Sequence, residues 1–427
     1  MNQEFLKIKN ISGEFELPGD KSISHRALIF SAMADGKSTI KNLADSVDVK
    51  TTAECLKNIG VKFESDSGNL IVHGVGFKGF NKPDEALYCG NSGTTARLLS
   101  GLFAAQDFST ILKGDESLSK RPMKRIIEPL EMMGCKIESN SGTLPLKIKP
   151  VDNLKSINYE LPVASAQVKS AILLAGLHLN EITTVIELKE TRDHTERMLN
   201  LTVEKYSDKI IIPVSKKNYP EHGEFFVPGD ISSAAYFIVL TLLSKNSSLV
   251  LKNVSINKTR TAYLYLLKQM GADISIIQKG NSYNEPLGDV IVKSSGLKNI
   301  EIDSAIIPLI IDEIPILTIA GIFAEGEFVI RNAKELRIKE SDRINSICVN
   351  LKTAGLNIEE FDDGFSVNGN IEKGSKIFKS FNDHRIAMSF AVLSSLIDDD
   401  CVVENFECVS ISNPKFLEQL KSVADFS

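Results

Sequence analysis

The sequence predicts a mixed α/β (α+β) protein of two similar lobes, each built from about three repeats of a unit of the βαβ type. One observation is a short phrase in which an amphipathic helix ends, most often on glycine, and a strand follows. This phrase recurs every 66 to 84 residues, at 56–63, 130–137, 267–274 and 351–358, with a weaker copy that lacks the glycine at 197–203. A second observation is a Pro-Gly-Asp turn before an apolar helix, which occurs at 18–20 and again at 228–230.

The two Pro-Gly-Asp turns lie 210 residues apart and mark the places where the chain passes between lobes. We expect 1–19 and 228–427 to form one lobe that contains both termini, and 20–227 to form the other, with a cleft between them. A hairpin signal follows most repeats, as at 65–69. The five copies of the phrase mark five units. A sixth unit would be completed if the last helix, near 416–420, led into the first strand, near 5–8.

Composition excludes several classes of protein. The chain has 427 residues, 43% of them hydrophobic, and a formal net charge of −6, which argues against a dedicated nucleic-acid or membrane-surface binder. No apolar run reaches the roughly 18 residues of a membrane span, and no signal peptide is evident at the N-terminus. The six cysteines show no metal-ligand spacing, so we expect reduced thiols in a cytoplasmic protein without a metal site.

The first element to suggest function is the turn and helix that follow the strand at 13–17. Apolar residues at 27–34 predict a buried helix, and Asp20 or Ser22 can cap its start. Lys21 and Arg26 therefore lie near free backbone N–H groups that already favour an anion. This arrangement predicts a site for phosphate or carboxylate; the alternative is an ordinary capped helix with solvated charges.

Four further stretches of the first half share this character. They are the glycine-rich stretch 89–99, the basic run 113–125, the small and polar entry to a helix at 162–172, and the charged turn 191–196. The glycine-rich stretch lacks the Gly-Lys-Ser/Thr ending of a nucleotide-binding loop, so it does not predict ATP binding. Taken singly, three of these stretches have a plain structural alternative: a tight turn for 89–99, a solvated basic face for 113–125 and a solvated turn for 191–196.

In the second half, Asp312 and Glu313 stand inside an apolar run, where a carboxylate must find a partner or change its pKa. Two further charged stretches, at 336–344 and 381–388, then lead into helices. Together the stretches place many cations at helix starts, as would suit substrates with several phosphate and carboxylate groups: Lys21, Arg26, Arg121, Arg343 and Arg385. Asp312 and Glu340 are the carboxylates we expect to transfer protons.

Six motifs resemble, in order, the signatures of the 5-enolpyruvylshikimate-3-phosphate synthase family. They lie at 18–27, 90–97, 117–123, 164–171, 337–343 and 382–388. The resemblance implies two lobes, each of three βαβαββ units, with the active site in the cleft. It also implies a monomeric transferase of aromatic amino-acid biosynthesis, on the shikimate pathway to chorismate. Such an enzyme joins phosphoenolpyruvate to the 5-hydroxyl of shikimate 3-phosphate and releases phosphate, without metal or cofactor and with no nucleic-acid or membrane partner.

The resemblance also implies roles for individual residues. Ser22 and Arg26 would hold the shikimate carboxylate, and Ser165 with Arg192 its phosphate. Gln167 would lie between the two substrates, while Ala166 and Asn91 belong to the same binding motifs. Phosphoenolpyruvate would be held by Lys21, Gly93, Arg121, Arg343 and Arg385.

For catalysis, the resemblance implies that Asp312 accepts the proton of the 5-hydroxyl and that Lys339 contacts the same sugar. Glu340 and Lys21 would serve proton transfer at the methylene carbon of phosphoenolpyruvate.

Three positions bear on how closely the family pattern is followed. Some members have a second serine where Ala166 stands, and some have a lysine near Ile411; both groups are absent here. Gly93 matches the members that are sensitive to the inhibitor glyphosate.

Three alternatives were weighed against this interpretation. The sister enzyme that transfers enolpyruvate to UDP-N-acetylglucosamine typically carries a reactive cysteine in the loop at 117–122, and no cysteine lies between 90 and 134. A nucleic-acid binder is disfavoured by the acidic composition and by the lack of aromatic residues in the basic run. A catalytically dead binding protein is disfavoured by the presence of Asp312 and Glu340.

Overall fold

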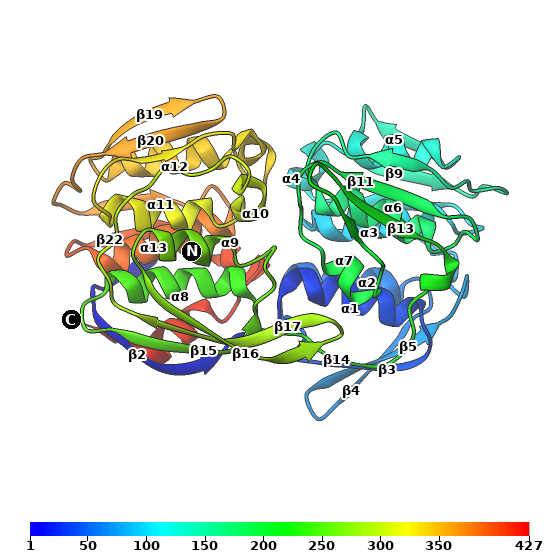
Figure 1. Cartoon of the computed structure of the whole chain (residues 1–427), viewed down its shortest axis with the longest axis horizontal. Coiled ribbons are helices and arrows are strands. Elements are labelled where there is room, and N and C mark those ends of the chain that lie inside the picture. The colour runs from blue at the N-terminus through cyan, green and yellow to red at the C-terminus, as the bar shows by residue number, and fades with distance from the viewer. Residues whose placement is uncertain (427) are drawn as a thin grey trace. The chain divides into compact units, whose positions relative to one another are not determined.

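The computed structural model describes residues 1–426, and the chain divides into two compact units (Figure 1). The first unit comprises Met1–Pro18, Pro228–Gly280 and residues 286–426. The second unit comprises Gly19–Val227 together with the short segment Asn281–Glu285. Neither unit is a single continuous stretch of chain.

Three four-stranded sheets of one topology form the second unit. In each sheet, two parallel strands are followed by two antiparallel neighbours. The first sheet contains, in order of neighbours, β14 (Glu224–Phe226), β3 (Asp35–Lys41), β5 (Asn69–Val75) and β4 (Lys62–Asp66). The second contains β6 (Leu87–Tyr88), β7 (Thr110–Lys113), β9 (Thr143–Lys149) and β8 (Lys136–Asn140). The third contains β10 (Asn158–Glu160), β11 (Thr183–Glu187), β13 (Ile210–Val214) and β12 (Glu204–Lys205). This threefold recurrence confirms that the repeats in the sequence are structural units.

Three helices form the centre of the second unit and are buried along most of their length: α1 (Lys21–Met33), α3 (Gly93–Phe103) and α6 (Ala166–Gly176). Each has buried residues on most of its faces, and in α1 these include polar side chains such as His25 and Arg26. The other helices of this unit are α2 (Val47–Lys57), α4 (Glu116–Lys120), α5 (Lys124–Met132), α7 (His194–Met198) and the 3₁₀ helix η1 (Lys216–Asn218).

The side chain before each central helix caps it, because it accepts a hydrogen bond from a backbone N–H of the first turn. Asp20 caps α1 at 3.0 Å, Ser92 caps α3 at 3.1 Å and Ser165 caps α6 at 3.4 Å. Of the two caps that the sequence allowed for α1, Asp20 is therefore the one used.

The first unit repeats the plan with three more sheets. The first contains, in order of neighbours, β16 (Asp273–Ser282), β17 (Glu285–Lys293), β15 (Ser248–Ser255), β2 (Ile8–Glu16) and β23 (Ala424–Phe426). The second contains β18 (Phe328–Ile330), β20 (Gly364–Asn368) and β19 (Asn357–Phe361), and the third contains β1 (Gln3–Phe5), β22 (Cys401–Glu404) and β21 (Lys376–Lys379). In the first of these sheets β2 and β15 are parallel, β17 pairs antiparallel with β15, and β16 lies beside β17. The edge strand β23 is added on the other side and pairs antiparallel with β2.

Three buried helices again form the centre, namely α8 (Ile231–Leu243), α11 (Ile314–Phe323) and α13 (His384–Leu396). In Figure 1 they lie between the sheet that contains β2 and β15 and the hairpin of β19 and β20. The remaining helices are α9 (Ala262–Gln269), α10 (Ile307–Ile310), α12 (Arg343–Thr353), α14 (Phe416–Val423) and the 3₁₀ helices η2 (Lys334–Ile338) and η3 (Phe406–Ile411).

The glycine of each repeated phrase lies just past a helix end, in a left-handed backbone conformation. Gly60, Gly134, Gly271 and Gly355 have φ of 98°, 97°, 106° and 86°. The weaker copy uses Asn200 at φ 49° in the same place. Asparagine is the residue other than glycine that enters this conformation most readily, so the fifth copy keeps the geometry without the glycine.

The N-terminal strands complete the last repeat, which confirms the closure that the sequence suggested. β1 pairs with β22, so that Gln3 lies opposite Val403, and β2 pairs with β23, so that Ile11 lies opposite Ala424. Both pairs are antiparallel, and all four strands belong to the first unit.

The close packing of α3 on α6 gives a test of the fold. A Cβ added at Gly101 would lie 2.1 Å from the backbone oxygen of Ala171. Alanine normally favours a helix by about 1 kcal/mol over glycine, but here we expect Gly101→Ala to destabilise the protein by about 1–3 kcal/mol, because the helices must separate. Urea unfolding measures this change.

Gly280→Ala is the control for this prediction, since a Cβ there would meet nothing within 4 Å. A Gly101→Ala protein as stable as the wild type would contradict the described contact between the two helices.

Candidate active site

The N-terminal turn of α1 carries the first predicted site residues. Lys21 forms an ion pair of 3.0 Å with Asp48, the second residue of α2. The guanidinium of Arg26 is buried and donates to the hydroxyls of Thr195 and Ser170, each at 2.7 Å, and to the backbone oxygen of Ser22 at 2.9 Å. Burial lowers the pKa of Arg26 to about 10, so the group keeps its charge at neutral pH.

The glycine-rich stretch and the basic run meet at Asn91. Its side-chain oxygen accepts a hydrogen bond from Arg121 at 2.7 Å, and its amide nitrogen donates to Asp115 at 2.7 Å. Gly93 is the first residue of α3, and a Cβ there would lie 3.4 Å from Nη1 of Arg121. Arg121 is only 8% exposed, so the interpretation of 113–125 as a solvated face is wrong at this residue.

The start of α6 holds Ser165, Ala166 and Gln167. Gln167 accepts a hydrogen bond of 2.5 Å from Arg97 and donates one of 2.9 Å to Thr94. The same Arg97 nitrogen would lie 2.7 Å from a Cβ at Gly93. Arg97 thus joins the α3 and α6 helix starts, although sequence reasoning gave it no role beyond its place at the end of the glycine-rich motif.

The turn at 191–196 is largely buried, so its alternative interpretation as a solvated turn is wrong. His194, Thr195 and Glu196 are each less than 5% exposed, whereas Arg192 is partly buried. Glu196 forms an ion pair of 2.6 Å with the buried Lys169 of α6. This pair fixes α7 against α6 and so places Thr195 where it accepts from Arg26.

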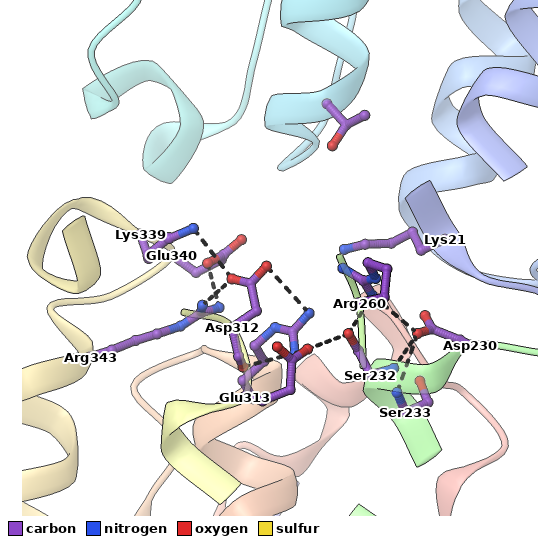
Figure 2. Close-up of polar contacts among 12 residues, drawn as sticks. Lys21, Asp230, Ser232, Ser233, Arg260, Asp312, Glu313, Lys339, Glu340 and Arg343 are labelled. Atoms are coloured by element: carbon purple, nitrogen blue, oxygen red, sulfur yellow. Dashed lines mark hydrogen bonds and ion pairs between the residues drawn. The ribbon is translucent and has the colours of Figure 1, made fainter. Parts of the chain in front are cut away.

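The first unit contains a second cluster of predicted residues, drawn in Figure 2. Oδ1 of Asp312 lies 3.3 Å from Lys339 and 3.1 Å from Nη1 of Arg343. Arg385 donates to the backbone oxygen of Asp312 at 2.9 Å. Glu340 pairs with Nη2 of Arg343 at 2.6 Å. The structure therefore brings together all five site residues predicted in this unit.

Arg343 is the centre of this cluster, with 1% of its side chain exposed. Burial alone would lower the pKa of Arg343, but Asp383, Glu340 and Asp312 together raise it well above its ordinary value. Asp383 is fully buried and contacts Nε of Arg343 at 2.8 Å. Asp383 also caps α13 through the backbone N–H of Arg385, at 2.9 Å. Its role as partner of Arg343 was missed, because 40 residues separate the two.

A third group beside this cluster was also not predicted. The hydroxyl of Ser232 donates to Glu313 and accepts from Arg260 at 2.5 Å, as Figure 2 shows. Ser232 lies in the first turn of α8, where Asp230 caps the helix through its N–H at 2.8 Å. Arg260 stands in no motif, so only the fold could reveal it.

Two features are absent from residues 1–426. No three histidine, cysteine, aspartate or glutamate side chains in this range come together in a way that could hold a metal ion. No helix in the same range has the length and apolar character needed to cross a membrane.

Comparison with known proteins defines the class of fold first. The enolpyruvyl transferase NikO of Streptomyces tendae superposes with a TM-score of 0.78 at 15% identity, over 99% of this chain and 98% of that one. The EPSP synthase of Acinetobacter baumannii superposes with a TM-score of 0.86 at 40% identity, over 99% and 98% of the two chains. The protein therefore has the enolpyruvyl-transferase fold.

Sequence comparison then defines the family. The family model described as EPSP synthase (3-phosphoshikimate 1-carboxyvinyltransferase) matches residues 6–420. The 3-phosphoshikimate 1-carboxyvinyltransferase of Petrotoga mobilis is 48% identical over 99% of both chains, and that of Bacillus subtilis is 42% identical over 98% of both. The chain belongs to the EPSP synthase family, which confirms the family predicted from the motifs.

The pair of Asp383 and Arg343 gives a test of the cluster. We expect Asp383→Asn to destabilise the protein by about 3–5 kcal/mol, because it leaves part of the charge of a buried arginine uncompensated. The change in the free energy of urea unfolding measures it. The matched control is Asp398→Asn, which breaks an ion pair with Lys7 whose aspartate is 85% exposed, and which should cost no more than about 1 kcal/mol. Equal effects of the two variants would contradict a buried ion pair at Arg343.

Proposed function

We propose that this chain transfers the enolpyruvyl group of phosphoenolpyruvate to the 5-hydroxyl of shikimate 3-phosphate and releases phosphate. Membership of the EPSP synthase family supports the reaction. The observation that carries the residue assignment is Asp312, a carboxylate held by Lys339 and Arg343. The reaction belongs to the biosynthesis of chorismate and of the aromatic amino acids.

The chemistry requires one proton acceptor and one proton donor. The 5-hydroxyl must lose its proton as its oxygen bonds to the central carbon of phosphoenolpyruvate, and the methylene carbon must gain a proton. The methyl group so formed later gives up a proton as the bond to phosphate breaks, which restores the double bond. The sum of these steps consumes no oxidant and leaves the proton count unchanged.

In our proposal Asp312 accepts the hydroxyl proton. Its contacts with Lys339 and Arg343 fix the carboxylate in one orientation, and a base must be so fixed to meet a bound hydroxyl at hydrogen-bond distance. Lys339 then lies beside the same sugar. Glu340 and Lys21 serve proton transfer at the methylene carbon, and the contact of Glu340 with Arg343 holds its carboxylate in place.

The remaining residues bind the anionic groups. Arg121, Arg343 and Arg385, together with Lys21 and Gly93, hold phosphoenolpyruvate, because planar guanidinium groups match carboxylate and phosphate oxygens in pairs. Ser22 and Arg26 hold the shikimate carboxylate, and Ser165 with Arg192 its phosphate. Gln167 contacts both substrates. Asn91 acts through Arg121, which it holds, and Ala166 supplies no hydroxyl to the phosphate.

The UDP-sugar reaction of the sister enzyme is not favoured. The segment at 117–122, where that enzyme typically has its reactive cysteine, contains the end of α4 and Arg121, which contacts Asn91. The nearest cysteines in sequence are Cys89 and Cys135, both buried, and burial raises the pKa of the Cys135 thiol to about 12. A thiol of this kind is a poor nucleophile.

We further propose a monomeric enzyme of the cytoplasm, with its two small-molecule substrates as its partners. All six cysteines are free, as is usual in a reducing compartment.

The experiment that tests the function measures phosphate release from phosphoenolpyruvate with each acceptor in turn. We expect release with shikimate 3-phosphate and none with UDP-N-acetylglucosamine. We also expect Asp312→Asn to lower kcat by about 10²–10⁴-fold, since a general base contributes about that factor. Asp303→Asn is the control, because Asp303 caps the exposed turn at Ala305. Release with the UDP-sugar, or full activity in Asp312→Asn, would contradict the proposal.

A separate prediction concerns the inhibitor glyphosate, to which we expect the enzyme to be sensitive. In Gly93→Ala the added Cβ would lie 2.7 Å from Nη1 of Arg97, so this guanidinium must shift, and it would come into van der Waals contact with Arg121 at 3.4 Å. We expect weaker inhibition and a higher KM for phosphoenolpyruvate, measured by inhibition at several phosphoenolpyruvate concentrations. Gly280→Ala should leave both values unchanged. A wild-type enzyme inhibited only by a large excess of glyphosate would contradict the prediction.

A further inference from the structure

A continuous chain of buried hydrogen bonds crosses the second unit from α1 to α3. Nδ1 of His25 lies 2.7 Å from Oγ1 of Thr52, and this oxygen lies 2.6 Å from Oγ1 of Thr95. Thr95 in turn donates to Oγ of Ser92 at 2.7 Å. All four side chains are at most 1% exposed. They come from three helices and the cap of one of them, and none has been given a role in the reaction.

The hydrogen bonds that link His25 to Ser92 can have only one direction. A threonine hydroxyl has a single proton, and that of Thr95 is given to Ser92. Thr95 must therefore accept from Thr52, and Thr52 must accept from Nδ1–H of His25. His25 is thus the neutral Nδ1–H tautomer, and its Nε2 is buried without a hydrogen-bond partner. Burial, and after it the charges of Lys21 and Arg26, lower the pKa of His25 well below its ordinary value, in agreement with a neutral ring.

His25 and Ser92, at the two ends of this series of hydrogen bonds, lie near the helix starts that bind substrate in our proposal. His25 is in the first turns of α1, between Lys21 and Arg26. Ser92 caps α3 and directly precedes Gly93. Thr52 is the middle link, on α2, one turn after Asp48, the partner of Lys21. A shift of Thr52 would therefore alter both helix starts together.

We propose that Thr52 is a positioning residue, whose hydroxyl holds the N-terminal turn of α1 in register with that of α3 and so aligns Lys21 with Gly93 for phosphoenolpyruvate. This inference rests on the proposed function. Thr52 touches no substrate itself, and it acts by fixing the spacing of groups that do. A buried hydroxyl with both a donor and an acceptor partner specifies one arrangement, because any other leaves a buried polar group unpaired.

The test replaces the hydroxyl by a methyl group of similar size in Thr52→Val. We expect KM for phosphoenolpyruvate to rise about tenfold or more, which corresponds to the loss of about one buried hydrogen bond. We expect kcat to fall as well, through the displacement of Lys21, but by a smaller factor than KM rises, because Asp312 and Glu340 belong to other elements. Thr52→Ser restores the hydroxyl and should restore KM.

The matched control is Thr241→Val on α8. Thr241 is equally buried, and its hydroxyl donates only to the backbone of its own helix, at Phe237. We expect it to change stability without changing KM. An unchanged KM in Thr52→Val, an equal rise in Thr241→Val, or no rescue by Thr52→Ser would overturn the proposal. If Thr52→Val does not fold, Thr95→Val removes the next hydroxyl and should give the same rise in KM.

A second measurement is independent of the reaction. The imidazole ¹⁵N shifts of histidine-labelled protein, with His25 assigned by a His25→Asn variant, report its tautomer. We expect Nδ1–H in the wild type and loss of this preference in Thr52→Val; an Nε2–H tautomer in the wild type would overturn the hydrogen-bond direction. An enzyme that shows the Nδ1–H tautomer but no phosphate release would refute the proposed function and leave the chain of hydrogen bonds intact.

Discussion

Much of this structure depends on how the backbone N–H groups at the starts of its buried helices find hydrogen-bond acceptors. The first N–H groups of a helix have no partner within it, and in a buried helix water cannot supply one. Each centrally placed helix of the second unit solves this with one side chain, from Asp20, Ser92 or Ser165. The same short turns carry most of the residues that we propose bind anions there. In our proposal, stability and substrate binding therefore depend on the same few positions.

The two units treat the charge at these positions differently. In the first unit Asp230, Asp342 and Asp383 cap helices, and Asp383 also neutralises Arg343. In the second unit two of the three caps named above are neutral serines, and the hydrogen bonds of Arg26 go to uncharged oxygens. The first unit thus has the carboxylates to which we assign proton transfer. In the second unit most of the residues that we propose bind anions lie at helix starts, whose partial positive charge favours anions.

The sequence was sufficient to predict the repeats and the glycine helix ends, and to name the residues of the candidate site that the structure brings together, because the motifs that carry them are local. Asp312 was found because a carboxylate in an apolar run is unusual. Arg260 was not found, because its partner Ser232 is 28 residues away and neither stands in a motif that implies the other. The burial of His194 was missed because a charged turn looks solvated until α7 is packed. The copy at 197–203 was found without its glycine, and only the structure shows that Asn200 takes the left-handed conformation in its place.

The pairing of the N-terminal strands has a consequence for synthesis on the ribosome. Residues 3–16 emerge first, yet β1 pairs with β22 and β2 with β23, which emerge last. The second unit, apart from Asn281–Glu285, is complete once Val227 has emerged. The nascent chain can thus fold the second unit early, while β1 and β2 each keep an unpaired edge until β22 and β23 have emerged. A chain truncated before its last strands would leave these edges open and prone to aggregation.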